Sequence, residues 1–346
     1  MAEKDHIREL DFARVISMLA VIMIHVSAPY MNRESTIALG GMNLAWMLNQ
    51  VTRFAVPLFV LLSGTSLGFS RSIGSVSGFY QKRAVKIGIP YVMWFTLHFL
   101  YHQVHDVPAP AVTAGGFLRA FLQGQGAPHL YFIVIVAQCY LLYPLLRRAV
   151  ERAPGASVGL SLVCTGGIQL AYALRREGIV DLIPGWVSPY LWLLFPTWAF
   201  FFVLGMALNR EKLLALRRLT AAHPWALTAA GFAAMGAYVA IAWRTGTLDS
   251  IKLSLDIYVP AMLVFAFALW QLAGRFRWVQ AAVRFLSAHA MTVYFCHVLV
   301  LWQFQTDWRF TGGMVGMLEL YLLDTVLSVL LAWGLDSLGK LLRKRA

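Results

Sequence analysis

The sequence is poor in charged residues, and this scarcity limits the class of protein. Only 13% of its 346 residues are Asp, Glu, Lys or Arg, whereas 59% are hydrophobic and 14% are aromatic. A soluble globular domain carries roughly 25% charged residues. The composition therefore excludes an ordinary soluble domain. It predicts a polytopic membrane protein that interacts with the lipid bilayer.

Cysteine is also scarce, and the common motifs of soluble enzymes are missing. Cys139, Cys164 and Cys296 lie in apolar runs without paired spacing, which argues against a disulfide framework or redox chemistry. The sequence contains no P-loop and no H-E-x-x-H motif, and His98 with His102 is the nearest approach to metal-ligand spacing. We expect no metal cofactor.

Long apolar runs are what the sequence does have. Each run is bounded by charge or by Gly, Pro or Asn, and each is long enough to cross a bilayer. They predict an all-α bundle of about ten transmembrane helices that forms a single domain over residues 1–346, without a separate soluble domain. The ten runs are 11–31, 43–69, 87–106, 130–148, 156–174, 187–208, 224–243, 255–273, 282–305 and 314–337.

The basic residues alternate between the two sides that these runs define. With the N-terminus placed in the cytoplasm, twenty Lys and Arg fall on the cytoplasmic side and seven on the other, while Arg14 and Arg53 lie inside runs. This asymmetry predicts that both termini are cytoplasmic. It also explains the net charge of +13 without nucleic-acid binding, which we do not expect because no basic domain stands outside the apolar runs.

The first run contains two residues that are costly in a membrane, Arg14 and His25. Eleven helical steps of about 100° separate them, which is about 20° more than three full turns, so both side chains point to one face. The rise between them is roughly 16 Å, about half of the hydrocarbon core. This face is the first candidate for an active site.

Other polar groups are predicted at a depth similar to that of His25, in the outer half of the bundle. Each has an ordinary structural explanation: a buried His can serve only in packing, and Arg53 can extend to the outer interface. His25 is the strongest candidate because it shares a helix face with Arg14. The other members of the group are Asn49, Arg53, His98, His102, His129, Asp256, Tyr294 and His297.

On the cytoplasmic side, Lys82, Arg83 and Lys86 lie just before the third run and form a cationic group at the start of its helix. Such a group could bind the phosphates of a nucleotide-like ligand that arrives from the cytosol. Positive-inside anchoring of the helix explains the same residues, and their spacing alone favours that explanation.

Taken together and in order, several segments resemble the acyltransferase 3 family of membrane acyltransferases. Two departures stand out: Lys86 occupies the second position of the family's R-x-x-R motif, and Tyr131 stands where Trp is usual. The matching segments are Arg14 and His25 with ten residues between them, PLFVLLSGTSL at 57–67, KRAVKIGIPY at 82–91, HLYFIVIVAQCYLLYPLL at 129–146, FFVLGMAL at 201–208 and SAHAMTVYFCHVLVLW at 287–302.

The resemblance implies transfer of an acyl group, usually acetyl, from cytosolic acyl-CoA to a hydroxyl of a sugar or other cell-envelope acceptor, including lipid-linked acceptors. The implied location is the bacterial cytoplasmic membrane, and the implied activity is that of a polysaccharide-modifying O-acetyltransferase. A neutral imidazole suits the role of general base, and buried donors suit an oxyanion. The expected roles are catalytic for His25, Arg14, His297 and Tyr294, coenzyme A binding for Lys82, Arg83, Lys86 and Arg14, and acceptor binding for Arg53, Asn49, His129 and Asp256.

Two other functions fit parts of the pattern. In a proton-coupled transporter or flippase of a glycan or small molecule, the buried His, Asp and Arg residues would form a pathway, although no inverted repeat or paired broken helices are evident. A scaffold would use them only for packing. Direct transfer and a covalent acyl-His relay both remain open, as do the acyl chain, the acceptor and the oligomeric state.

Overall fold

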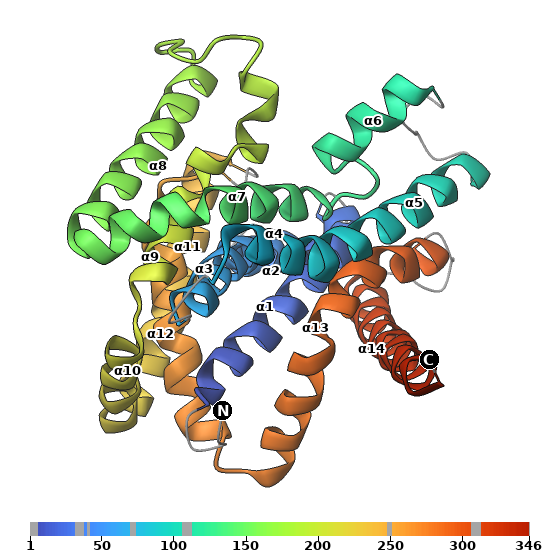
Figure 1. The fold of residues 1–346 in the computed structure, drawn as a ribbon. Coiled ribbons are helices and arrows are strands. Elements are labelled where there is room, and N and C mark those ends of the chain that lie inside the picture. Colours follow the sequence, from blue (N-terminus) through green and yellow to red (C-terminus); the bar gives the residue numbers. More distant parts are fainter. Residues whose placement is uncertain are drawn as a thin grey trace. The chain divides into compact units, whose positions relative to one another are not determined.

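The computed structural model is almost entirely helical and forms two compact units (Figure 1). The first unit contains residues 1–59, 214–248 and 257–346, and the second contains 60–213 and 249–256. The structure describes residues 6–31, 38–39, 42–69, 74–105, 113–247, 251–305 and 313–345. Four of the Lys and Arg residues that were assigned to the two sides of the membrane lie outside these ranges: Lys4, Arg33, Arg71 and Arg309.

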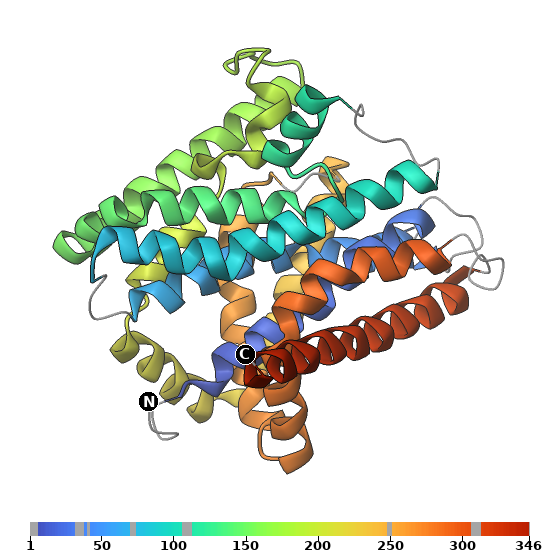
Figure 2. The same cartoon turned by 45° about the vertical axis from the view of Figure 1, so that its right-hand side comes forward.

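The first unit is organised around α1, which packs against α13 and α14. The last two helices run side by side in both views (Figures 1 and 2). The two short strands pair antiparallel, with Ala38 opposite Asn43. The elements of this unit are α1 (Arg8–Ser27), η2 (Ala28–Tyr30), β1 (Ala38–Leu39), β2 (Met42–Asn43), α2 (Leu44–Val51), η3 (Thr52–Phe54), α11 (Pro224–Thr245), α13 (Arg277–Phe304) and α14 (Gly313–Arg345).

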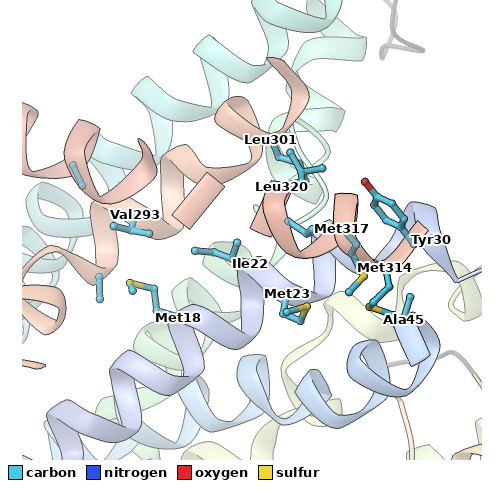
Figure 3. Packing of buried hydrophobic residues seen from close by; sticks show 13 residues of the cluster. Met18, Ile22, Met23, Tyr30, Ala45, Val293, Leu301, Met314, Met317 and Leu320 are labelled. Atoms are coloured by element: carbon cyan, nitrogen blue, oxygen red, sulfur yellow. The ribbon is translucent and has the colours of Figure 1, made fainter. Parts of the chain in front are cut away.

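An apolar stripe on α1 forms the core of this unit. Met18 and Ile22 are four residues apart and therefore share a helix face, and each is 1% exposed. Figure 3 shows them beside Val293 of α13 and near Met317 and Leu320 of α14. Burial of this stripe fixes which face of α1 meets the two C-terminal helices.

The second unit contains the middle of the chain. Its helices α7, α8 and α9 pack against one another, and α4 continues through a π-helical turn, η4, into α5 (Figure 2). Three helices have residues in both units: α3 (Ala55–Gly68), α10 (Arg210–Ala222) and α12 (Ser254–Ala273). The remaining elements are α4 (Val76–Arg83), η4 (Ala84–Gly88), α5 (Ile89–Val104), α6 (Ala114–Gln123), α7 (Tyr131–Arg152), α8 (Pro154–Arg176), η5 (Ser188–Leu193), η6 (Phe195–Thr197) and α9 (Ala199–Ala207).

Within the second unit, α3 and α9 approach each other backbone to backbone. A β-carbon added at Gly64 would lie 2.2 Å from the carbonyl oxygen of Phe202, and one added at Gly205 would lie 2.0 Å from that of Leu61. Neither position accepts a side chain without moving main chain. Close contact through small residues is a common way for helices to associate in membranes. Two of the segments that carried the family resemblance, 57–67 and 201–208, therefore meet through their glycines.

Eight helical stretches in the described residues are long and apolar enough to cross a membrane. Many large apolar side chains on them face outward, including Leu160 and Val163 of α8 and Leu322 of α14. This exposure suits a lipid environment. The all-helical, multi-pass prediction is confirmed, whereas the count of ten and the side of the termini remain predictions. The eight stretches are Arg8–Tyr30, Leu44–Gly68, Tyr131–Arg152, Pro154–Arg176, Pro224–Thr245, Ser254–Ala273, Arg277–Phe304 and Gly313–Leu341.

The two other predicted spans, 87–106 and 187–208, take different forms. The first contains α5, which is 16 residues long, and the second is divided into η5, η6 and α9. Prolines at the starts of η5 and η6 explain the interruption, because Pro supplies no N–H to a continuing helix.

Side chains of neighbouring helices satisfy the interrupted backbone. Gln138 of α7 donates to the carbonyl oxygen of Leu193 at 2.8 Å and accepts from the N–H of Phe195 at 3.0 Å. Thr165 of α8 donates to the carbonyl oxygen of Pro196 and accepts from the N–H of Phe200. Irregular backbone at membrane depth requires protein partners of this kind.

Candidate active site

Two histidines of the first unit face each other. The ring of His25 on α1 lies 5.4 Å from the ring of His297 on α13, measured between centroids and with the planes tilted by 48°. His25 is partly buried, and His297 is fully buried. Nδ1 of His297 lies 2.8 Å from the carbonyl oxygen of Tyr294. Because a carbonyl only accepts, Nδ1 carries the hydrogen, and in the neutral ring Nε2 is the acceptor.

Arg14 and His25 share the face of α1 that meets α13. Nη1 of Arg14 donates to Oδ1 of Asp11 at 2.8 Å and to Oγ of Ser287 at 3.4 Å. Ser287 and His297 both belong to α13. The sequence periodicity correctly predicted the common face, because α1 is unbroken from Arg8 to Ser27. The Asp11 carboxylate partly neutralises Arg14 from one turn away.

Asn49 connects α2 to the end of α1 and to Arg53. Its side chain is fully buried. Nδ2 donates to the carbonyl oxygen of Ile24 at 2.9 Å and to Oγ of Ser27 at 3.1 Å, while Oδ1 accepts from Nε and Nη2 of Arg53 at 3.0 and 2.7 Å. The same amide therefore holds the guanidinium of Arg53 and the backbone of Ile24, the residue before His25.

Aromatic side chains contact two parts of this group, the His297 ring and the end of α2. The Tyr294 ring lies 6.0 Å from that of His297 and 6.3 Å from that of Phe59. The rings of Tyr238 and Tyr258 stack at 4.2 Å, and the Tyr258 hydroxyl donates to the carbonyl oxygen of Val51 at 2.6 Å. These two tyrosines were not among the predicted site residues, because their spacing resembles that of ordinary core aromatics.

The predicted phosphate-binding group lies on α4 and η4 of the second unit. Lys82 and Lys86 are exposed, whereas Arg83 is half-buried. The guanidinium carbon of Arg83 lies 5.3 Å from the centroid of the Phe79 ring and 5.1 Å from that of Tyr140. Two cation–π contacts thus hold Arg83 between aromatic side chains, which positive-inside anchoring alone does not require. The π turn that contains Lys86 is a feature frequent at functional sites.

The other predicted residues, His129 and Asp256, also belong to the second unit, in two separate groups. The His129 ring lies 5.2 Å from the His98 ring on α5, edge to face, and both are buried. Asp256 on α12 accepts a hydrogen bond from Nε2 of Gln169 on α8 at 3.2 Å. Gln169 was missed by sequence reasoning, since a single Gln in an apolar run has no distinguishing spacing.

Other buried charges have partners that suggest structural roles. Glu9 of α1 is 2% exposed and accepts from Nε and Nη2 of Arg217 at 2.7 and 2.6 Å, with a further bond from Gln271. His289 and Asp336 join α13 to α14 at 2.6 Å. Among the described residues, no group of three His, Cys, Asp or Glu is placed to hold a metal ion.

The helical, multi-pass architecture defines an integral membrane protein whose first unit contains a buried imidazole, His297, and the half-buried side chains of His25, Arg14 and Arg53. The family model described as "Acyltransferase domain" matches residues 7–336, and the chain therefore belongs to the acyltransferase 3 family. The "Putative membrane-bound acyltransferase YfiQ" of Bacillus subtilis (strain 168) is 22% identical over 298 residues, which cover 84% of this chain and 80% of that protein. No solved structure matches the chain. The family prediction is confirmed, and the protein is a membrane acyltransferase.

Proposed function

We propose that this enzyme transfers an acyl group, most commonly acetyl, from cytosolic acyl-CoA to a hydroxyl of a sugar or other cell-envelope acceptor. The proposed setting is the bacterial cytoplasmic membrane, with both termini in the cytoplasm. Membership of the acyltransferase family supports the reaction class. The observation that carries the detailed proposal is the His25–His297 pair, together with Asn49, which bonds both to Arg53 and to the carbonyl of Ile24 before His25.

In the proposed reaction His25 is the general base. It takes the proton of the acceptor hydroxyl as the oxygen attacks the thioester carbonyl. The carbonyl oxygen becomes an oxyanion, which Arg53, Asn49, Tyr294 and His297 are candidates to stabilise in a site of low dielectric constant. Collapse of the intermediate breaks the C–S bond, and the proton moves from His25 to the coenzyme A thiolate. The products are an ester and free coenzyme A.

The proposed donor site uses the cations of α4 and η4. Lys82, Arg83 and Lys86 would bind the phosphates of coenzyme A, and the aromatic contacts of Arg83 support this role because they restrict its motion before the ligand arrives. Lys86 would act as a point charge, without the two-pronged geometry of arginine. Arg14 is assigned to the path of the thioester, and His129 and Asp256 to acceptor binding.

The test of the general base compares His25→Ala with His223→Ala, which removes an exposed histidine outside the site. Washed membranes containing each variant receive acetyl-CoA labelled in the acetyl group, and label in the envelope fraction is counted. We expect His25→Ala to lower transfer by about 100-fold or more, in line with loss of a general base, and His223→Ala to leave it unchanged. Normal transfer by His25→Ala membranes would overturn the assignment.

A second experiment, on purified protein, distinguishes direct transfer from a covalent relay. Direct transfer predicts that no acetyl group accumulates on the protein when the acceptor is withheld. Rapid quenching of purified wild-type protein with acetyl-CoA, followed by peptide mass spectrometry, measures this directly. An acetylated peptide containing His25 would establish the relay instead.

A further inference from the structure

Gln169 and Asp256 form a buried polar pair within the second unit, between α8 and α12. Gln169 is 2% exposed and Asp256 is 8% exposed. Nε2 of Gln169 donates to Oδ1 of Asp256 at 3.2 Å, and because a carboxylate accepts, this bond fixes the orientation of the amide. Both residues belong to helices that can span a membrane, where such groups are usually functional.

Each member of the pair retains one side-chain oxygen that could accept a further hydrogen bond. Oε1 of Gln169 and Oδ2 of Asp256 are buried and have no hydrogen-bond partner among the described residues. Buried polar atoms in native proteins are nearly always hydrogen-bonded, so two orphaned acceptors side by side indicate a ligand that donates hydrogen bonds. An anionic ligand such as a phosphate is excluded, because the pair would repel it.

A glycine pair on α8 leaves space next to this carboxylate. A β-carbon at Gly166 would lie 3.7 Å from Oδ2 of Asp256, in ordinary van der Waals contact, whereas one at Gly167 would have no neighbour within 4 Å. Consecutive glycines are unfavourable in a helix interior, and their presence requires a compensating reason. At Gly166, a side chain would take up the space between α8 and Oδ2 of Asp256.

We propose that Gln169 and Asp256 bind neighbouring hydroxyl groups of the acyl acceptor, and that Gly166 leaves the position beside the carboxylate free of a side chain. The proposal rests on the proposed function, in which the acceptor carries hydroxyls, and narrows the acceptor to a compound with at least two of them close together. Oε1 and Oδ2 each accept from one hydroxyl. A sugar ring satisfies this requirement, and a simple monohydric alcohol does not.

The test uses two substitutions that differ only in position. Gly166→Ala places a methyl group beside Oδ2, whereas Gly167→Ala adds the same group to open space and serves as the matched control. Full-length protein in nanodiscs is assayed with labelled acetyl-CoA and increasing amounts of envelope fraction from a host that lacks the gene. Acetyl-CoA binding is measured separately by calorimetry, and the thermal midpoint is recorded for each variant.

We expect Gly166→Ala to raise the KM for the envelope acceptor by about tenfold, which corresponds to loss of one or two hydrogen bonds. Acetyl-CoA affinity and the thermal midpoint should match those of Gly167→Ala. Gln169→Met, which removes the amide and keeps the chain length, should raise the same KM. Methyl glucoside and ethanol are then compared as competitors of the envelope acceptor. Ethanol should inhibit acetyl transfer to the envelope less than methyl glucoside does.

The outcomes separate this inference from the proposed function. If the wild-type protein neither binds acetyl-CoA nor transfers acetyl, the proposed function fails. If the wild type transfers acetyl but Gly166→Ala and Gln169→Met keep a normal KM for the acceptor, the pair holds only water and the inference is overturned. A lowered thermal midpoint for Gly166→Ala with an unchanged KM for Gln169→Met also overturns it.

Discussion

Arg53 donates two hydrogen bonds to the side-chain oxygen of Asn49, from Nε at 3.0 Å and from Nη2 at 2.7 Å. Nδ2 of the same amide donates to the carbonyl oxygen of Ile24, the residue before His25. One fully buried amide therefore sets the position of the guanidinium relative to the proposed base. The two residues are four apart, so the face that they share was predictable, whereas the bond to α1 was not.

Replacement of Asn49 tests this coupling. Asn49→Leu removes the bonds of Asn49 to the Ile24 carbonyl and to Arg53, at a cost of about 1–3 kcal/mol in the free energy of unfolding. We expect transfer to fall by about tenfold or more because Arg53 is released. Asn49→Asp keeps the acceptor for Arg53 and should retain more activity than Asn49→Leu. Equal activity of the two variants in the labelled-acetyl assay would contradict the coupling.

The aromatic setting of Arg83 gives a second prediction. Tyr140→Leu removes one of the two rings against the guanidinium, whereas Tyr140→Phe keeps the ring and removes only the hydroxyl. Because an exposed cation–π contact contributes about 0.5–1 kcal/mol, Tyr140→Leu should weaken acetyl-CoA binding about two- to fivefold. Calorimetry on the purified protein measures this, with Tyr140→Phe near wild type. Unchanged affinity in Tyr140→Leu would show that the ring does not position Arg83 for the donor.

The contact between α3 and α9 predicts strong intolerance to small changes. Gly64→Ala and Gly205→Ala each bring a methyl group within about 2 Å of a carbonyl oxygen on the other helix, so the helices must separate. We expect both variants to lose most folded protein, measured by size-exclusion chromatography of detergent extracts. Gly236→Ala on α11 is the matched control, since a β-carbon there meets nothing within 4 Å. Normal yield of either contact variant would disprove this packing.

The buried ion pair of the first unit predicts an asymmetry. Glu9 is almost fully buried, whereas the Arg217 side chain is 34% exposed. Arg217→Ala leaves a buried carboxylate without its cation and should destabilise the protein by about 3–5 kcal/mol. Glu9→Gln removes the buried charge and should cost less. The double variant should be more stable than Arg217→Ala alone. Thermal unfolding of all three in detergent tests the order, and a double variant less stable than both single variants would refute it.

Periodicity in the sequence was enough to predict the faces of helices. Arg14 and His25 were expected on one side of an uninterrupted helix, and both side chains indeed contact α13. Periodicity does not identify which helix covers a face. Ser287 lies 273 positions beyond Arg14, and the choice of partner depends on the packing of α1 against the last two helices.

Other features of the structure were not predicted because they also depend on contacts between residues that are far apart in the sequence. Arg217 was counted as one of many cytoplasmic cations, yet it pairs with a buried Glu 208 positions away. Gln169 had no sequence signal, and its role depends on the position of Asp256. The segment 187–208 has the hydropathy of a span, but its prolines and the side chains of Gln138 and Thr165 allow an interrupted backbone. Such outcomes depend on contacts between distant residues, which local pattern cannot show.

The pairing of Arg14 with Asp11 bears on how the first helix enters the bilayer during synthesis. An isolated arginine at the centre of a membrane helix costs about 2.5–3.5 kcal/mol on insertion scales. Asp11 lies one turn from Arg14 and is available as soon as α1 is made, whereas Ser287 lies 273 positions later in the chain, on α13 with His297. The local ion pair therefore accompanies Arg14 through insertion, and the His25–His297 pair forms only after α13 has been made.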